Sequence, residues 1–313
     1  MRLFLPLKNG IPSHDTVSRV FRLLDPQAFE RAFRRFLKSF ARHNKLKLTG
    51  SIAIDGKSSC HAYERGKSAT PLHMVNAFAA EARIALASRK APRRNESEAA
   101  LEVLRMLDLE GNIVTADALF CSRPFALAVL KKRGHYVLAL KKNQRKLFAA
   151  VECCFAHGGP RSNAGRIEPS THGRRESRRA TVIRNTALAN DHKFPGIKAI
   201  ARVTSRRSLR GTKAQPPYIR YYLLSKYLRA EALLRTVRGH WSIENQLHWM
   251  LDVVLKEDAD RARKDNAPEN FAILRKLALN ILRAHPQKIS MRQKIKSAAW
   301  DDSFLLSLIA HMR

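Results

Sequence analysis

Apolar residues recur with a strand period or a helix period through residues 51–140 of this 313-residue chain. Short apolar runs predict buried strands at 51–55, 72–80, 83–87, 112–117 and 136–140. Apolar positions at helical spacing predict helices at 96–107 and 124–133. This order of elements predicts an α/β fold in which a mixed sheet carries flanking helices.

Other patterns mark the segments around this region. Ser13 or Asp15 is expected to cap a first helix, and Asp25-Pro26 to begin a second one. A run rich in Gly, Pro, Arg and Ser follows the core, and strand-like pieces come after it at 180–184, 198–203 and 218–224. We therefore divide the chain into a helical N-terminal segment with a basic face (1–48), the first part of an α/β core (49–156), a β-rich basic insertion (157–226), a helical part of the core (227–285) and a basic C-terminal tail (286–313).

A helical stretch between residues 239 and 254 carries unusual polar side chains. Its apolar residues recur on one helix face and are Ile243, Leu247, Met250, Leu251 and Val254. His240, Glu244 and His248 follow one another every four residues on a neighbouring stripe. A carboxylate and two imidazoles at the start of a half-buried helix favour a functional site over a plain packing element.

The balance of charge is far from that of an ordinary folded protein. Lys and Arg number 59 against 26 Asp and Glu, which gives a net charge of +33 and an isoelectric point near 10.9. Phosphates attract cations along every nucleic-acid backbone, so nucleic acid is the favoured partner. An anionic membrane surface is a weaker alternative, and an organism with an Arg-rich proteome is the alternative that needs no partner. The sequence has no run of ~20 apolar residues, so no membrane span is expected, and its first residues lack the pattern of a signal peptide. The cysteines lack zinc-ligand spacing, and a reducing cytoplasm is the expected compartment.

Three carboxylates form the candidate catalytic set. Asp55 and Asp117 each end an apolar strand, and sites in α/β sheets gather at the carboxyl ends of the strands. Glu244 is expected to approach them on a helix packed against the same sheet. Phosphodiester chemistry needs an activated nucleophile and compensation of the charge on the leaving oxygen, and two divalent ions held by carboxylates provide both. The alternatives are turn caps for the aspartates, a surface position for Glu244, and, less favoured, metal ligation by His240 and His248.

Two basic groups are candidates for contacts with phosphates. The predicted second helix combines an apolar face with a basic stripe formed by Arg31, Arg34, Arg35, Lys38 and Arg42. A solvated helix face is the alternative for that stripe. The segment after the strand at 136–140 carries Lys141, Lys142, Arg145 and Lys146, which are positioned to contact a DNA backbone without reading its sequence.

Three further expectations concern packing. Trp241 and Trp249 are expected in the core, with stacking on splayed bases as the alternative. Cys121 is expected to be a small packed residue. An acidic cluster is expected to be solvated and ion-paired with Arg261 and Arg263, and its members are Asp252, Glu257, Asp258 and Asp260.

Several motifs together resemble one protein family. They are Ile52–Lys57, Pro71–Phe78, Val114–Ala118, Tyr136–Gln144, His240–Asn245, Leu247–Trp249, Leu251–Val253 and Glu257-Asp258. In these motifs the chain resembles the insertion-sequence transposases of the H-repeat-associated kind. The resemblance extends over nearly the whole chain, and the combination is far more specific than any single motif.

The resemblance implies an RNase H-like core with a β-rich insertion between its second and third acids. It also implies a DDE active site that nicks and joins DNA with Mg²⁺, or with Mn²⁺ as the alternative ion. By motif, Asp55, Asp117 and Glu244 are the three catalytic acids and metal ligands. Arg238 matches the arginine of the signature around the third acid and is expected to touch DNA phosphate. The expected partners are element ends, target DNA and a second copy of the chain, with no membrane, at the nucleoid in a bacterial cytoplasm.

Three departures from the family pattern lead to a different functional hypothesis. Family members usually carry a further helical segment before the motif found here at Pro12–Asp15, so an N-terminal truncation is expected. Leu251 stands where the related wider signature has a lysine, and Ser58–His61 replaces a basic continuation. The alternative function is therefore a catalytically inactive DNA-binding remnant or regulator of a transposable element, and a basic RNA-binding protein is the third.

Overall fold

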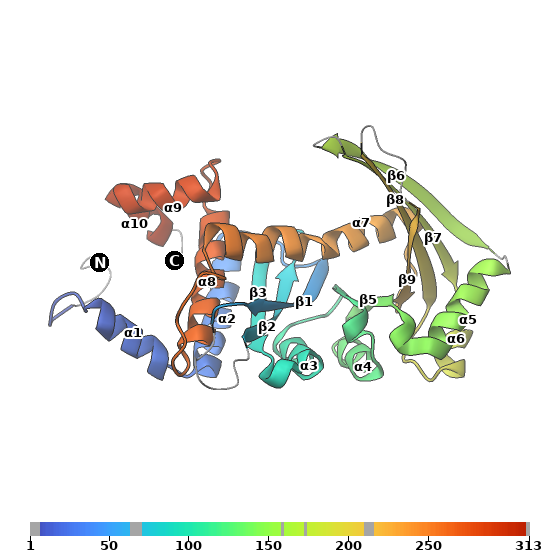
Figure 1. The fold of residues 1–313 in the computed structure, drawn as a ribbon, viewed down its shortest axis with the longest axis horizontal. Coiled ribbons are helices and arrows are strands. Elements are labelled where there is room, and N and C mark those ends of the chain that lie inside the picture. The colour runs from blue at the N-terminus through green and yellow to red at the C-terminus, as the bar shows by residue number, and fades with distance from the viewer. Residues whose placement is uncertain (1–6, 63–70, 158–159, 172–173, 210–215, 311–313) are drawn as a thin grey trace. The chain divides into compact units, whose positions relative to one another are not determined.

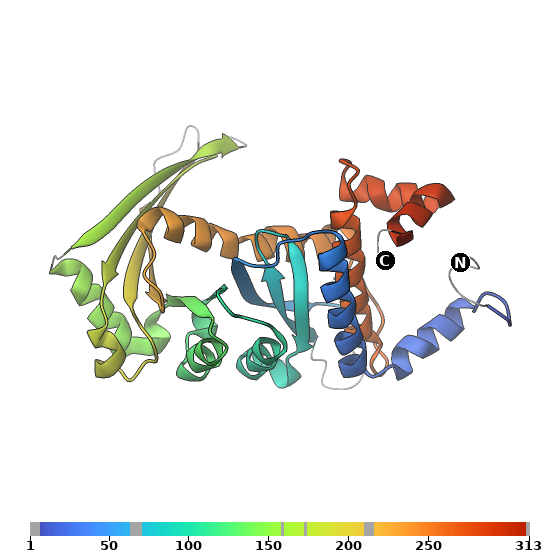
Figure 2. The same ribbon diagram turned by 180° about the vertical axis from the view of Figure 1, so that it is seen from behind.

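The computed structural model describes residues 7–62, 71–157, 160–171, 174–209 and 216–310. It separates into two compact units (Figures 1 and 2). The smaller unit comprises Met1–Leu46, Lys57–Met74 and His248–Arg313. The larger unit comprises Lys47–Gly56 and Val75–Leu247.

The larger unit is built on a mixed sheet with the strand order β3-β2-β1-β4-β5-β9-β8-β7-β6 in the described part of the chain. Its strands are β1 (Ser51–Ser59), β2 (Leu72–Ala79), β3 (Ile84–Lys90), β4 (Ile113–Ala116), β5 (His135–Leu140), β6 (Arg161–Thr171), β7 (Arg174–Arg184), β8 (Ala199–Leu209) and β9 (Tyr218–Leu224). Strands β1, β4 and β5 are parallel, and β9 joins β5 in the antiparallel sense. Strands β6 to β9 are antiparallel throughout. The predicted α/β fold with a large mixed sheet is confirmed.

The parallel strands are buried on both faces, which explains why their sequences are continuous apolar runs. Ile52 and Ile54 of β1 are at most 1% exposed, and Val114 of β4 is fully buried. Tyr136 of β5 is also fully buried, and its hydroxyl group donates a hydrogen bond to the Pro195 carbonyl at 2.6 Å. These strands form the rigid centre of the larger unit.

Helices cover both faces of this centre. The helices of the larger unit are α3 (Glu96–Met106), α4 (Arg123–Lys131), α5 (Arg145–Ala156), α6 (Ala187–Asp191) and α7 (Ala230–His240). Helix α7 lies on one face of the parallel strands, and α3 and α4 lie on the other (Figure 1). Leu233 and Val237 of α7 pack in one apolar cluster with Val203 and Tyr222 of the antiparallel strands. The sheet and α7 are thereby held together along most of the helix.

The basic segment after the core contains more regular structure than its sequence indicates. Strand β6 and the first half of β7 occupy the Gly-, Pro-, Arg- and Ser-rich run, where no strand is predicted. Strand β6 is the edge strand of the sheet, and polar residues are common on such strands. Its contact with α7 includes the small residue Ala164 and a hydrogen bond from the Ala230 amide to the Ser162 hydroxyl, so β6 needs few large apolar residues. Helix α5, which follows the Lys141 to Lys146 segment, is a second element that the apolar pattern did not identify.

The smaller unit contains helices α1 (His14–Leu23), α2 (Pro26–His43), α8 (Ala267–Ala284), α9 (Met291–Trp300) and α10 (Asp302–Ala310). The predicted caps of the first two helices are confirmed for Ser13 and Asp25. The Ser13 hydroxyl accepts from the Thr16 amide, and the Asp25 carboxylate accepts from the amides of the first turn of α2. Phe21 of α1 stacks on Phe271 of α8 with ring centroids 4.8 Å apart.

A buried lysine organises the acidic cluster of the smaller unit. The ammonium group of Lys57 lies 2.7 Å from Asp252, 3.0 Å from Glu257 and 3.4 Å from Asp258. Burial opposes the charge on Lys57, but the carboxylates outweigh it and raise the pKa of Lys57. Asp260, the fourth acid, pairs with Arg275 at 2.7 Å. The expectation of a solvated cluster is wrong here, since Glu257 is only 3% exposed and the partners Lys57 and Arg275 were not foreseen.

Among the residues that the structure describes, no helix is long and apolar enough to cross a membrane.

Candidate active site

Two of the predicted acids stand on neighbouring parallel strands or directly after them. Asp117 follows β4, as predicted, whereas Asp55 lies inside β1, so the prediction that Asp55 ends its strand is wrong. The strand continues to Ser59 because backbone pairing does not stop where the apolar run stops. Strand β1 pairs with β4 so that Ala53 faces Thr115 and Ile54 faces Ala116. Asp55 and Asp117 come next along the two strands. Adjacent strands lie ~4.8 Å apart, so this register brings the two aspartates to the same edge of the sheet.

Asp117 also holds the turn that follows β4. One of its carboxylate oxygens accepts a hydrogen bond from the Leu119 amide at 2.8 Å, at the start of the short helix η2 (Ala118–Phe120). The turn-cap alternative raised from the sequence is therefore correct for this oxygen. The cap fixes the orientation of the carboxyl group, and the side chain as a whole remains half-buried.

Glu244 lies just beyond α7, where the helix widens. Residues Ile243–His248 and Met250–Val254 form π-helical turns. Ile243, Leu247 and Leu251 are fully buried, which confirms the predicted apolar face, whereas Glu244 is exposed. π-helical turns occur mostly as local insertions and are frequent at functional sites.

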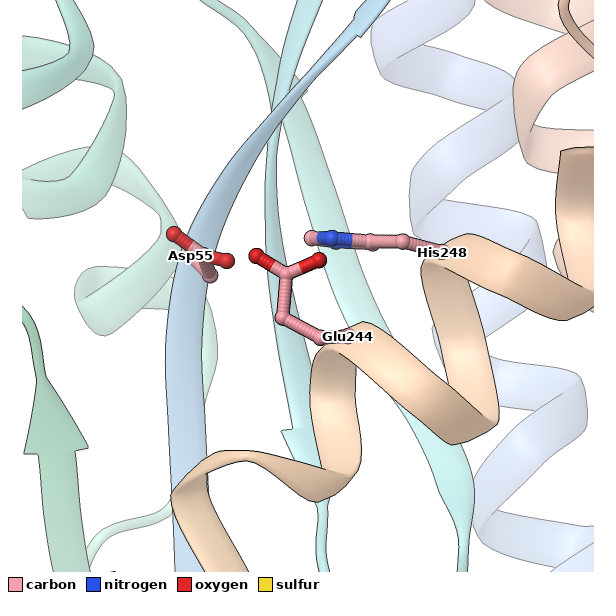
Figure 3. Close-up of side chains that lie close together, drawn as sticks. All are labelled: Asp55, Glu244 and His248. Carbon is pink, nitrogen blue, oxygen red and sulfur yellow. The ribbon is translucent and has the colours of Figure 1, made fainter. Parts of the chain in front are cut away.

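The carboxyl groups of Asp55 and Glu244 meet, although 189 residues separate them in the sequence (Figure 3). Their nearest oxygens lie within 4.8 Å of each other, and Asp55 also accepts from the Gly56 amide at 2.9 Å. Burial, followed by the charge of Glu244 and a hydrogen bond with it, raises the pKa of Asp55 from its ordinary value of 3.8 to about 8. The charge of Asp117 adds a smaller contribution in the same direction. At neutral pH this pair of carboxyl groups therefore shares one proton.

The donor set fits a divalent cation. Mg²⁺ prefers oxygen ligands and is commonly bound by one or two carboxylates and several waters. A cation between Asp55 and Glu244 would replace the shared proton and remove the repulsion between two negative groups. Asp117, which the structure also describes, is not part of the closest group of ligand atoms and stands one strand away. His248 follows Glu244 by one helical turn, and a ring nitrogen lies within 4.8 Å of a Glu244 oxygen (Figure 3).

A cleft of about 410 Å³ opens beside Asp117 in the larger unit. Its lining includes Lys141, Tyr218, Arg220 and Trp241. The Arg220 guanidinium lies 4.6 Å from the centroid of the Tyr218 ring and 4.8 Å from that of Trp241. This cluster of a cation and two aromatic rings is a feature that sequence reasoning missed, because it joins residues from β9 and from the end of α7.

The packing expectations have mixed outcomes. Trp241 is 38% exposed and Trp249 is 53% exposed, so the prediction that both belong to the core is wrong. Cys121 is 1% exposed, as predicted, and burial raises the pKa of its thiol. Ile243 and Leu247 form the buried side of the helical stretch, and the two tryptophans lie on its solvent-exposed side.

The predicted phosphate contacts fall into two groups. In the larger unit, the predicted contacts are all exposed, and they are Lys141, Lys142, Arg145, Lys146 and Arg238. Lys141 and Lys142 also line the cleft beside Asp117. In the smaller unit, the stripe on α2 is exposed except for Arg34, which pairs with the buried Glu30 at 2.7 Å. Arg31 lies 3.9 Å from Asp25, so both Arg31 and Arg34 also have partners within the chain.

Comparison with known proteins identifies the family. The family described as "Transposase DDE domain" matches residues 28–281, and the one described as "DDE_Tnp_1-associated" matches residues 1–37. The first match covers well over half of the chain.

This chain belongs to the DDE transposase family.

Its relatives carry names of the same kind. The chain is 33% identical to "H repeat-associated putative transposase YhhI" of Escherichia coli K12 over 97% of its own length and 82% of that protein. It is also 33% identical to "Putative protein YbfL" of the same strain, with the same coverage. The identity to "Putative transposase YncI" of Escherichia coli O157:H7 is 34%, over 96% of this chain and 79% of that protein. The resemblance inferred from the sequence motifs is confirmed.

The core of a DDE transposase is RNase H-like, and the mixed sheet and flanking helices of this transposase agree with that fold. Two amide side chains after β5 support the Asp117 edge of the sheet. Asn143 donates to the Ala118 carbonyl at 2.7 Å, and Gln144 donates to the Cys121 carbonyl at 3.2 Å. Both residues belong to a motif quoted above, but their supporting role emerges only from the folded chain.

Proposed function

We propose that this chain is a catalytically active DDE transposase that cleaves DNA at the ends of an insertion sequence and joins them to target DNA. Asp55, Asp117 and Glu244 are the catalytic acids in this proposal. The observation that carries it is the meeting of Asp55 and Glu244 beside the strand end that presents Asp117. A DNA-binding remnant would need none of these three carboxylates to be close together.

The three acids would hold Mg²⁺, or Mn²⁺, in place of the proton that Asp55 and Glu244 share. When bound, such ions lower the pKa of a water or hydroxyl nucleophile and stabilise the charge on the leaving oxygen. The chain itself supplies the orientation of the ligands. The Leu119 amide fixes Asp117, the Gly56 amide fixes Asp55, and the buried face of the helical stretch fixes Glu244.

Basic side chains around the acids would bind the DNA backbone. Lys141 and Lys142 reach the cleft beside Asp117, and Arg238 is exposed on the last turn of α7. Contacts of this kind position DNA and carry no sequence information. The net charge of +33 provides the long-range attraction for such a substrate. We further propose that the transposase acts as a homodimer on element ends, at the nucleoid of a bacterial cytoplasm.

A plasmid-nicking assay tests the proposal. The substrate is a supercoiled plasmid that carries the candidate element ends, incubated with Mg²⁺ or Mn²⁺. We expect nicking by the natural chain and a loss of at least about 10³-fold in Asp55→Asn and Glu244→Gln, since each removes a charged ligand. Asp108→Asn is the matched control, because Asp108 is exposed and an asparagine retains its bond to the Glu110 amide.

The same experiment includes a measurement of DNA retention by gel shift. We expect both acid variants to retain DNA as well as the natural chain does. If the natural chain binds DNA and fails to nick with either ion, the inactive remnant is the correct function. If Asp55→Asn nicks as fast as the natural chain, the assigned acids are wrong.

A further inference from the structure

One buried hydroxyl group connects β1, which carries Asp55, with β4 and α7, which come shortly before Asp117 and Glu244 in the chain. Thr115 of β4 is 2% exposed. Its Oγ1 atom lies 3.5 Å from the carbonyl oxygen of Ile52 in β1 and 3.1 Å from Nδ1 of His240 at the end of α7. All three residues belong to the larger unit.

Each of these residues lies a short distance before one acid in the sequence. Ile52 precedes Asp55 by three residues, and Thr115 precedes Asp117 by two. His240 precedes Glu244 by four, which is about one helical turn. We propose that the Thr115–His240 hydrogen bond is a positioning device that sets where Glu244 stands relative to the two strand-borne acids. The inference rests on the proposed function of those acids.

Apolar packing alone does not fix this position. Helix α7 packs on the sheet through Leu233 and Val237, and apolar contacts have no preferred direction. A hydrogen bond from the Ala230 amide to the Ser162 hydroxyl at 3.1 Å ties the first residue of α7 to β6, at the end of the helix away from Glu244. A hydrogen bond loses strength steeply with distance and angle, so it selects one position of the helix along the strands. The bond also lies at the last residue of α7, immediately before the π-helical turns that present Glu244. A small slide of α7 would be passed on to the Glu244 carboxylate.

The hydrogen-bond inventory at Thr115 is consistent with this role. A threonine hydroxyl has one proton to donate and can accept as well. Donation to the Ile52 carbonyl leaves the oxygen free to accept from the Nδ1–H of His240, and donation to Nδ1 is the other arrangement. Both satisfy the hydroxyl in a site where an unpaired polar group would be costly, and neither requires a charged imidazole.

Removal of the hydroxyl at constant shape is the central experiment. Thr115→Val keeps the branched side chain and loses the bond, and Thr115→Ser restores a hydroxyl. Thr236→Val is the matched control, because Thr236 is also a buried threonine of the larger unit, and its hydroxyl donates only to the Ala232 carbonyl of its own helix at 3.0 Å. The measurements are the nicking rate at saturating DNA, the DNA concentration at half-maximal rate, and Mn²⁺ affinity from electron paramagnetic resonance.

We expect Thr115→Val to reduce the nicking rate about 10- to 100-fold, because a misplacement of about 1 Å costs up to ~10²-fold in rate. The half-maximal DNA concentration should stay within twofold, and Mn²⁺ affinity should fall about tenfold. Thr115→Ser should recover most of both losses, and Thr236→Val should show neither. A rate for Thr115→Val within twofold of the natural chain would overturn the proposal.

Variants at His240 separate positioning from direct contact with DNA. Asparagine can replace the Nδ1 donor, and alanine cannot. His240→Asn should therefore retain more activity than His240→Ala, and the double variant Thr115→Val/His240→Ala should be no slower than the slower single variant. Additive losses, or a loss in His240→Ala confined to the half-maximal DNA concentration, would show that His240 acts on DNA and not through Thr115.

Failure of the proposed function would look different. A natural chain that neither binds Mn²⁺ nor nicks DNA would refute the function of the acids. The positioning claim would then be decided by crystal structures of the natural chain and of Thr115→Val, in which the Glu244 carboxylate must move by about 1 Å or more. An unmoved Glu244 would refute the claim.

Discussion

The proton shared by Asp55 and Glu244 gives this transposase a specific pH dependence of stability. Below the ordinary pKa of 3.8, Asp55 is protonated in both the folded and the unfolded chain. Between that value and its folded pKa of about 8, the unfolded chain has released the proton and the folded chain retains it. The free energy of unfolding therefore falls as pH rises through this range.

The magnitude follows from the number of protons. One proton retained only by the folded chain changes the free energy of unfolding by about 1.4 kcal/mol per pH unit. From pH 5 to pH 7 the loss from this group is therefore about 2.7 kcal/mol. The asparagine of Asp55→Asn resembles the protonated carboxyl group and does not titrate, so this variant should not show the loss. Between pH 5 and pH 7 its free energy of unfolding should therefore rise relative to that of the natural chain by about 2.7 kcal/mol.

Urea titrations in the presence of a chelator measure the effect. The natural chain and Asp55→Asn are unfolded at pH 5, 6 and 7, and the difference between their free energies is plotted against pH. Glu244→Gln is the second variant, because it removes the charge that helps to raise the pKa of Asp55 and should shrink the loss. If the curves of the natural chain and Asp55→Asn run parallel from pH 5 to pH 7, the two carboxyl groups do not share a proton.

Three other properties can be tested in the same preparations. Lys57→Met should lower the free energy of unfolding, measured in urea, by about 3–5 kcal/mol, because it leaves buried carboxylates without their cation. Adding Glu257→Gln to this variant should recover part of the loss, since it removes one of those carboxylates. No recovery in the double variant would contradict this account. Mn²⁺ at 100 times its dissociation constant should raise the free energy of unfolding by about 2.7 kcal/mol. The ion should bind more tightly at higher pH, because it displaces a proton. Calorimetry that finds the same Mn²⁺ affinity at pH 6 and pH 8 would argue against the shared proton. Arg220→Gln should weaken DNA binding and reduce the dependence of log affinity on log salt by ~1, and an unchanged slope would exclude a phosphate contact.

The parts of the fold that the sequence predicts are those whose local pattern and tertiary burial agree. Strands β1 and β4 begin as short apolar runs because both faces of the parallel sheet are covered. The pattern gives the bounds of β4 to within one residue, but it misses the polar end of β1, which continues past Asp55 to Ser59. The caps Ser13 and Asp25 are equally local, since each bonds amides within its own first turn. Strand β6 lacks such a signal because its outer edge pairs with nothing in the described chain, so its polar sequence resembles a loop.

The sequence predicts which residues form the candidate site, but it does not predict their protonation. The ends of two apolar runs identify Asp55 and Asp117, and the polar stripe of the helical stretch identifies Glu244. The resemblance to known transposases supports all three. The raised pKa of Asp55 depends on how closely a helix from far along the chain approaches β1, and no local pattern records that distance. The same limit applies to the cleft beside Asp117, where Arg220 and Trp241 meet from separate elements.

The position of β9 in the sheet has a consequence for the order of folding during synthesis. This strand is the last of the sheet to leave the ribosome, yet it lies between β5 and β8. Strands β6, β7 and β8 can pair with one another as soon as they emerge, because they follow one another in the chain and pair in that order. They can join the parallel strands only after residues 218–224 have been made. Until then the edges of β5 and β8 that β9 will cover are free to pair with other nascent chains. Chaperone dependence should therefore be greatest at chain lengths just short of β9.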